Sequence, residues 1–281
     1  YQYCAYRILE ELVPMRRFEY QSPRHNQGVS YGPFRYSWDL HAAWLMRRMA
    51  GKPVFDDNIG DVYRGWLYMR VPGHRVLRDG DGFSDSRPAN LGAATLLNYA
   101  YTGNPVVKWD FLRQGGMKGD PIPILLLNDP GLVPAEGLDE LPQTIDYGPI
   151  LGGMVARTGW NMGRNAADVV VEMKGGGYNF GNHQHADAGA FQIYYRGFQS
   201  GDLGQYHFYG TPYDSNFCKR SVAHSMLFVV DPAEKFRGTT TNDGGARFVL
   251  SCPLTPEQTT SNPLFANGTV LSSSVGPHAQ R

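Results

Sequence analysis

The chain has 281 residues, which is long enough to bury a sizeable core in one or two domains. Its 26 basic and 26 acidic residues cancel, which excludes a basic nucleic-acid-binding protein and an acidic solvating tail as descriptions of the whole chain. Its apolar runs are far shorter than the roughly 18 residues that a membrane span needs. A charge-poor chain with 13% aromatic residues favours a secreted or periplasmic protein that handles sugars.

The first part of the chain carries the three- to four-residue spacing of apolar side chains that predicts helices. One such segment has apolar residues at Trp38, Ala42, Leu45 and Met49, and a glycine and a proline follow it closely. We expect helices at Tyr3–Leu12, Tyr36–Met49, Ile59–Met69 and Asn90–Tyr101, arranged as antiparallel pairs joined by loops.

From about residue 120 the period of the apolar residues changes to two, which is typical of strands. We expect strands at Ala167–Met173, Gly189–Tyr195, Ser225–Asp231 and Arg247–Leu250, after a proline-bearing linker at Asp120–Pro149. Helices followed by strands indicate an α+β protein, with a helical domain over residues 1–118 and a β domain over residues 119–281.

The segment from Asn179 to Asp202 contains the most informative polar residues. His183 and His185 are two apart, so both imidazoles face the same side if the backbone is extended there. Asp202 follows after one strand length, and His224 opens the next predicted strand. Histidine and aspartate side chains suit Zn²⁺ or a similar transition metal, but the spacing matches no common zinc motif. The alternative is a pair of loop histidines that hydrogen-bond to backbone and water.

A second cluster lies in the segment HNQGVSYGPFR. Tyr31 and Arg35 are four residues apart and share a face of a helix. A nearby arginine can lower the pKa of a tyrosine hydroxyl toward that of a working base. A stacked or solvated Tyr–Arg pair explains the same spacing without any function.

Other motifs are weaker. The segment Asp79–Asp85 has closely spaced carboxylates, but it lacks the terminal glutamate of a calcium-binding EF loop. Cys4, Cys218 and Cys252 are too few for a disulfide framework, and the sequence allows either one bridge or three free buried thiols. Lys219 and Arg220 follow Cys218 and could activate its thiol, but packing in a core is the simpler interpretation.

Both clusters carry a family resemblance. The segments NHQHADAGAFQIYYRG, GDLG and RSVAHSMLFVVDPAEKF resemble the core of the heparinase II/III-like polysaccharide lyases, and most of all its heparinase II and alginate lyase branches. GMVARTGW resembles the first strand of that core, and HNQGVSYGPFR resembles the segment with the catalytic tyrosine. The resemblance covers roughly residues 24–50 and 150–236, and the two motifs occur in the family's order.

The resemblance implies a fold made of an incomplete (α/α) toroid followed by an antiparallel β-sheet sandwich. Only the last toroid helices fit before residue 119, so we expect the chain to be a piece of a longer protein, truncated at both ends. The catalytic asparagine of the family, often with an adjacent histidine, lies upstream of the tyrosine. No residue before Tyr31 matches that pair, and we expect it to lie outside this chain.

The resemblance also implies roles for individual residues. Tyr31 matches the catalytic tyrosine, Arg35 the arginine one helical turn beyond it, and His183 the catalytic histidine. The zinc ligands match His185, Asp202 and His224, at a site thought to be mainly structural. For substrate binding we expect His25, Arg220, Tyr206 and Tyr213.

The implied function is β-elimination next to a uronic acid, on a glycosaminoglycan such as heparin or heparan sulfate. An alginate lyase on the same scaffold is the main alternative, and a metal-dependent glycan hydrolase or a non-catalytic carbohydrate-binding fragment are two others. The expected partner is an anionic polysaccharide, with no nucleic acid and no membrane, and the expected location is the periplasm or the cell exterior. The oligomeric state stays open.

Overall fold

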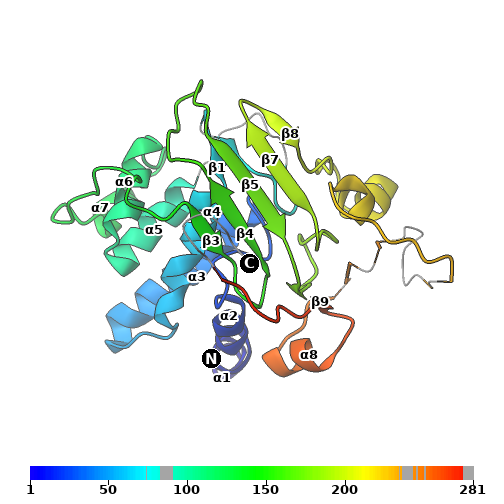
Figure 1. Cartoon of the computed structure of the whole chain (residues 1–281). Coiled ribbons are helices and arrows are strands. Elements are labelled where there is room, and N and C mark those ends of the chain that lie inside the picture. Colours follow the sequence, from blue (N-terminus) through cyan, green and yellow to red (C-terminus); the bar gives the residue numbers. More distant parts are fainter. Residues whose placement is uncertain are drawn as a thin grey trace.

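The protein is an α+β structure in which a helical half packs beside an antiparallel sheet (Figure 1). The computed structural model describes residues 1–73, 75–82, 91–233, 235, 243–244, 246–249 and 251–274. In Figure 1 the blue-to-green helices lie together on one side of the molecule, and the green-to-yellow strands lie beside them. Over this described part of the chain, no helix is long and apolar enough to cross a membrane.

The helices confirm the expected helical half and extend it. The chain is helical from Gln2 to Glu19, with a π-helical stretch at Arg7–Leu12. The helices of this half are α1 (Gln2–Tyr6), α2 (Val13–Glu19), α3 (Tyr31–Ala50), α4 (Tyr63–Tyr68), α5 (Gly92–Thr102), α6 (Pro105–Arg113) and α7 (Ile122–Leu127). A 3₁₀ turn at Asp57–Val62 forms the first half of the expected helix Ile59–Met69.

Helices α6 and α7 were not expected from the sequence. Asn104 caps α6, because its Oδ1 accepts hydrogen bonds from the backbone amides of Val106 and Val107 at 2.9 and 3.4 Å. Pro105 occupies the first helical position, where a missing amide hydrogen costs nothing. The short helix α7 falls inside the predicted linker, whose prolines favoured a loop there.

The main sheet has five antiparallel strands in the order β3–β4–β5–β7–β8. These are β3 (Thr144–Asp146), β4 (Gly153–Arg157), β5 (Val169–Lys174), β7 (Phe191–Tyr195) and β8 (Phe198–Ser200). Two smaller pairs join β1 (Arg70–Val71) with β2 (Arg75–Val76), and β6 (Gly177–Tyr178) with β9 (Ala266–Gly268). Helix α8 (Pro256–Ser261) lies near the C-terminal end. The expected strands Ala167–Met173 and Gly189–Tyr195 are therefore confirmed as β5 and β7.

Two predicted strands were wrong. Within the described part of the chain, Ser225–Asp231 forms only an isolated bridge, between Met226 and Ala190, and its Leu227 is 83% exposed. Residues 247–249 form no strand, and the last residue of that prediction, Leu250, lies outside the described residues. Both segments have strand-like composition, but a strand also needs a neighbouring strand with which to pair.

One hydrophobic cluster joins the two halves. It includes Tyr36 and Trp66 from the helices together with Val155, Val170 and Tyr194 from the sheet, and all five are buried. The division into domains 1–118 and 119–281, and the toroid and sandwich, stay predictions. The close packing of the two halves places the start of α3 against the loop between β6 and β7.

Candidate functional site

The candidate site forms where three segments meet. The first turn of α3 supplies Tyr31, and the loop between β6 and β7 supplies His183 and His185. The third segment follows β2 and supplies Asp81. Asn182 has a left-handed backbone with φ of 55°, which asparagine tolerates better than most residues. The tight turn at Asn182 therefore sets the direction in which His183 leaves the loop.

The ring of Tyr31 stacks on the ring of His183. The ring centroids are 3.6 Å apart and the planes are 6° from parallel. Tyr206 meets the Tyr31 ring edge-on, with centroids 6.2 Å apart. The structure thus brings together three of the residues that the sequence analysis assigned to catalysis or substrate binding.

Asp81 holds both histidines of the loop. Its Oδ2 lies 2.5 Å from Nδ1 of His183, and its Oδ1 lies 2.9 Å from Nε2 of His185. Burial raises the pKa of Asp81, but the hydrogen bonds from His183 and His185 outweigh it and hold the pKa at about 2. Asp81 is therefore an ionised carboxylate that only accepts hydrogen bonds.

This carboxylate selects different tautomers for the two rings. His183 donates through Nδ1, which leaves the lone pair of a neutral ring on Nε2. His185 donates through Nε2, which leaves its lone pair on Nδ1. The side chain of His183 keeps 9% exposure, whereas that of His185 is fully buried.

The free nitrogen of His185 faces two further predicted metal ligands. His185 Nδ1 lies 3.1 Å from Nε2 of His224 and 3.8 Å from Oδ2 of Asp202, and the last two atoms are 3.2 Å apart. The Nδ1 of His224 lies 2.9 Å from the carbonyl oxygen of Arg220, so it donates there and leaves Nε2 free. Burial by itself would raise the pKa of Asp202 and lower that of His224. The attraction between Asp202 and His224 outweighs burial, so the pKa of Asp202 is lowered and that of His224 is raised.

These three residues fit a zinc ion. Bonds of about 2.0–2.1 Å to a tetrahedral zinc place neighbouring ligand atoms about 3.3–3.4 Å apart, close to the separations found. Oδ2 of Asp202 is buried between the two imidazoles, and a cation bound there would offset its charge. Asp81 and the Arg220 carbonyl oxygen also orient the two imidazoles, because each accepts a hydrogen bond from the ring nitrogen that does not face the proposed metal.

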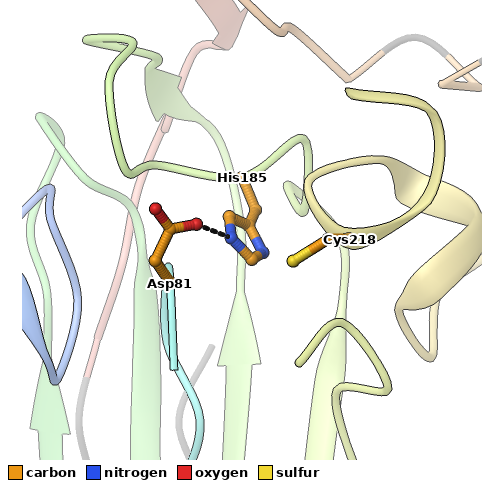
Figure 2. Close-up of side chains that lie close together, drawn as sticks. All are labelled: Asp81, His185 and Cys218. Atoms are coloured by element: carbon orange, nitrogen blue, oxygen red, sulfur yellow. Dashed lines mark hydrogen bonds and ion pairs between the residues drawn. The ribbon is translucent and has the colours of Figure 1, made fainter. Parts of the chain in front are cut away.

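Asp81, His185 and Cys218 form a second close group (Figure 2). Figure 2 shows the hydrogen bond between Asp81 and His185, with the sulfur of Cys218 on the other side of the ring. Burial, reinforced by the Asp81 charge, raises the pKa of the Cys218 thiol to about 12, so the thiol stays protonated and packs as expected. All three cysteines are free, but Cys4 and Cys252 are exposed, so neither a bridge nor three buried thiols was correct.

Lys219 adds a cation that the sequence analysis did not assign. Its Nζ lies 3.7 Å from Oδ2 of Asp81 and 3.2 Å from Oδ1 of Asp214. The same ammonium lies 5.8 Å from the ring centroid of Tyr206. A positive charge thus stands beside the Tyr31–His183 pair.

The other predicted site residues lie in different surroundings. The guanidinium of Arg35 packs over the ring of Trp38 at 5.0 Å, and Tyr213 packs near His207 with centroids 5.8 Å apart. His25 is 2% exposed and stacks on Trp66, and burial lowers the pKa of its ring to about 3. The Arg220 side chain is buried and pairs with Asp243. Their assigned roles stay predictions.

A network of buried ion pairs connects the segments that form the site. Arg24 donates two hydrogen bonds to Asp79 at 2.9 and 2.6 Å. Lys174 of β5 lies 2.9 Å from Asp79 and 2.5 Å from Asp187, two residues after His185. Burial raises the pKa of Asp79, but Arg24 and Lys174 outweigh it and lower the pKa well below its usual range. The network ties the segment with Asp81 to the helical half and to the sheet.

Sequence reasoning missed Asp81 and this network. The motif Asp79-Gly80-Asp81 was noticed, but it was compared only with a calcium-binding loop. The rest of that segment, from residue 83 onward, lies outside the described residues. A β-carbon on Gly80 would lie 2.7 Å from the His183 carbonyl oxygen, so a glycine is required for this segment to approach the histidine loop. The sequence feature that could have pointed to Asp81 is the pattern of two aspartates around a glycine.

Comparisons with known proteins identify a distant structural neighbour. No protein-family profile matches the chain, and no curated protein matches it. Among solved structures, it is similar to one described as a heparinase III gene product with methylated lysines, with 18% identity and a TM-score of 0.36. That match covers 61% of this chain and 24% of the other. The chain therefore matches only about a quarter of the length of that structure.

Proposed function

We propose that this protein is part of a polysaccharide lyase that cleaves next to a uronic acid by β-elimination. The observation that carries the proposal is the stacked Tyr31–His183 pair, in which Asp81 holds His183 by Nδ1. Two groups that can transfer protons therefore stand side by side, and one has its orientation set by a buried carboxylate. The motif resemblance to heparinase II/III-like lyases, with their toroid and sandwich, supports the same function.

The reaction requires a base for the C5 proton of the uronate and an acid for the leaving O4. Tyr31 has a hydroxyl that can give a proton to O4 and, as a phenolate, can take the C5 proton from the same face of the sugar. His183, with its lone pair on Nε2, is the base for the other C5 epimer. Each such group contributes about 10²–10⁴-fold to the rate.

The negative charge that develops on the uronate must also be offset. Lys219 lies beside Asp81 and Tyr206, and we expect its ammonium to attract the carboxylate of the substrate. Arg35 has a guanidinium one helical turn from Tyr31 and would bind the same carboxylate or tune the tyrosine. Electrostatic stabilisation of this kind is the largest expected contribution to catalysis. The proposed set that contacts or shapes the substrate site is completed by Tyr206, Tyr213, His25 and Arg220.

A zinc ion at His185, Asp202 and His224 would act as a structural anchor. When bound, it would fix the loop between β6 and β7 and the segment at His224 relative to each other. His183 lies two residues from His185, so the same anchor would hold the proposed base in place. The chain's own residues carry out the proton transfers.

The experiment is to offer heparan sulfate, chondroitin sulfate and alginate to the full-length protein and to follow the ultraviolet absorbance of an unsaturated product. Growth of absorbance on one polymer establishes elimination and identifies the polymer class. Tyr31→Phe removes only a hydroxyl, so we expect turnover to fall by about 10²-fold or more with an unchanged melting temperature. Tyr195→Phe on the exposed face of β7 is the matched control and should retain turnover.

Two results would contradict the proposal. Reducing ends that appear without an unsaturated product would indicate hydrolysis, and the metal site would then be the place to look for the nucleophile. Wild-type turnover in Tyr31→Phe would remove Tyr31 from the mechanism.

A further inference from the structure

A second tyrosine contacts the proposed catalytic tyrosine. The side chain of Tyr206 is hydrogen-bonded to the side chain of Tyr31. The two rings meet edge-on, with centroids 6.2 Å apart and planes at 88° to each other. Tyr206 is half-buried and lies in the loop that follows β8. The sequence analysis assigned Tyr206 to substrate binding, but its hydroxyl contacts the proposed acid and base directly.

This hydrogen bond has a direction. Partial burial raises the pKa of Tyr206 to about 12, and the hydrogen bond with Tyr31 contributes to the rise. A hydrogen bond raises the pKa of a phenol when it favours the protonated form, so the Tyr206 hydroxyl donates and the Tyr31 oxygen accepts. Tyr206 therefore keeps its proton at neutral pH. A hydroxyl that accepts one hydrogen bond still has its own hydrogen to donate, so Tyr31 can give that hydrogen to the substrate.

The backbone fixes Tyr206 relative to the catalytic pair. The Tyr206 amide donates a hydrogen bond to the carbonyl oxygen of Gly82 at 2.9 Å. Gly82 directly follows Asp81, which binds His183, and the ring of His183 stacks on Tyr31. The segment that orients the proposed histidine base therefore also holds the residue that donates to the proposed tyrosine.

The charged groups near the two hydroxyls come from separate segments. The ammonium of Lys219 lies 5.8 Å from the centroid of the Tyr206 ring. The same ammonium lies 3.7 Å from Asp81 and 3.2 Å from Asp214, and these carboxylates offset its charge. Arg35, which was expected to tune the catalytic tyrosine, packs its guanidinium over an aromatic ring of its own helix at 5.0 Å. The Tyr206 hydroxyl is therefore better placed than Arg35 to act on the catalytic oxygen.

We propose that Tyr206 is a positioning residue, whose hydroxyl holds the Tyr31 oxygen in place and stabilises the negative charge on it during elimination. This inference rests on the proposed lyase function and deepens it. When Tyr31 acts as the base, the C5 proton passes to its oxygen, the electron pair of the C5–H bond forms the C4–C5 double bond, and the bond from C4 to O4 breaks. The same proton then passes from Tyr31 to O4.

Tyr206 gives up no proton in this sequence. A hydrogen bond to a charged oxygen is roughly twice as strong as one to a neutral oxygen, so the contact favours Tyr31 in the ionised form that can take the C5 proton.

The first test is kinetic and uses the full-length protein on the uronate epimer that His183→Ala still cleaves, since Tyr31 would be both base and acid there. Tyr206→Phe should lower kcat by about tenfold or more and leave KM within about twofold. The limb of the pH profile that reports the base should move to higher pH by about one unit. Tyr209→Phe, which is 75% exposed in the same loop and lies 5.0 Å from the same Lys219 ammonium, is the matched control and should keep the wild-type profile.

The second test needs no substrate. In protein that carries isotope-labelled tyrosine, NMR follows the ring carbon that bears each hydroxyl, and Tyr31→Phe assigns the signal of Tyr31 by removing it. Tyr206→Phe should move the titration of that signal to higher pH by about one unit, because the donor is lost, and Tyr209→Phe should not move it. Tyr206→Phe keeps the ring and its packing, so the melting temperature should not change.

The outcomes separate this inference from the proposed function. An unsaturated product together with an unmoved titration and pH profile in Tyr206→Phe would overturn the inference and keep the lyase. A rise in KM alone would also overturn it and return Tyr206 to substrate binding. A moved titration without an unsaturated product from any polymer would keep the hydrogen bond but refute the lyase, and with it the role of Tyr206 in elimination.

Discussion

His183 and His185 are two residues apart and share one carboxylate, yet their surroundings differ. Asp81 reaches His183 through Nδ1 and His185 through Nε2. The free nitrogen of His183 belongs to a ring that stacks on Tyr31, whereas the free nitrogen of His185 faces Asp202 and His224. Asp81 therefore accepts a hydrogen bond from a different ring nitrogen of each histidine. This difference leaves His183 suited to proton transfer and His185 suited to binding a metal.

The comparison also shows what a two-residue spacing can and cannot do. In an extended segment it would place both rings on one side. Here the left-handed turn at Asn182 starts a loop, and the two rings approach Asp81 from different directions. Four predictions test this division between the two histidines and the network that supports it, beginning with the largest effect.

Replacing His183 with alanine should remove the proposed proton transfer and leave the proposed metal site unchanged. We expect His183→Ala to lose about 10²–10⁴-fold of the turnover on the substrate epimer that needs this base. Zinc content by elemental analysis should match the wild-type protein, because no ligand has been removed. His41→Ala, at an exposed position on α3, serves as the control. Loss of zinc in His183→Ala would show that the two histidines do not act separately.

Replacing His185 with alanine should give the opposite pattern. We expect His185→Ala to lose its metal and to be destabilised by about 3–5 kcal/mol, because Asp202 and Asp81 stay buried with one partner fewer. Chelation of the wild-type protein should likewise lower the melting temperature before it lowers turnover. The measurements are elemental analysis and thermal unfolding. Full metal occupancy in the variant would remove His185 from the ligand set.

Replacing Asp81 with asparagine should affect both histidines, but more weakly. Asparagine keeps the shape of the side chain and loses its charge, so either ring can turn to another tautomer. We expect zinc affinity and turnover to fall together by about 10–100-fold, as for other residues that orient metal-bound histidines. A metal titration and a turnover assay on the same sample measure the two effects. A fall in zinc affinity alone would show that Asp81 matters only for His185, and a fall in turnover alone would show that it matters only for His183.

The smallest effect is the pH dependence of stability. Folding lowers the pKa of Asp79, so its contribution to stability is complete above the unfolded pKa of about 3.9 and is lost as the pH falls through the lower folded value. Each tenfold difference between the folded and unfolded acid dissociation constants corresponds to about 1.4 kcal/mol of stability. Urea unfolding from pH 6 to pH 2 should show this decline, and Asp79→Asn should flatten it. An equal decline in Asp79→Asn would assign the acid sensitivity to other carboxylates.

Local patterns predicted much of the fold but not all of it. The helix α5 around Leu96 and the strands β5 and β7 follow from apolar periodicity. Helix α3 exists as expected, but Trp38, Leu45 and Met49, from which it was predicted, are exposed, and α3 buries Tyr36, Leu40 and Ala43 instead. The prediction at Ser225–Asp231 failed because, among the described residues, no strand pairs with it beyond Met226. In β5 the period of two was recognised, but Glu172 and Lys174 point inward and are buried. Asp79 and Asp187 pair with Lys174, and Gln192 donates a hydrogen bond to Glu172 at 2.6 Å.

The sequence by itself determined which chemical groups are available: a tyrosine at the start of a helix, two histidines on one loop, and an aspartate and a histidine further along the chain. Only the tertiary structure decided that Asp81, 102 residues before His183, would orient both histidines. The physical reason is that tautomer, burial and ligand geometry depend on atoms within a few ångströms of each other. Such contacts between distant segments leave no periodic pattern in the chain.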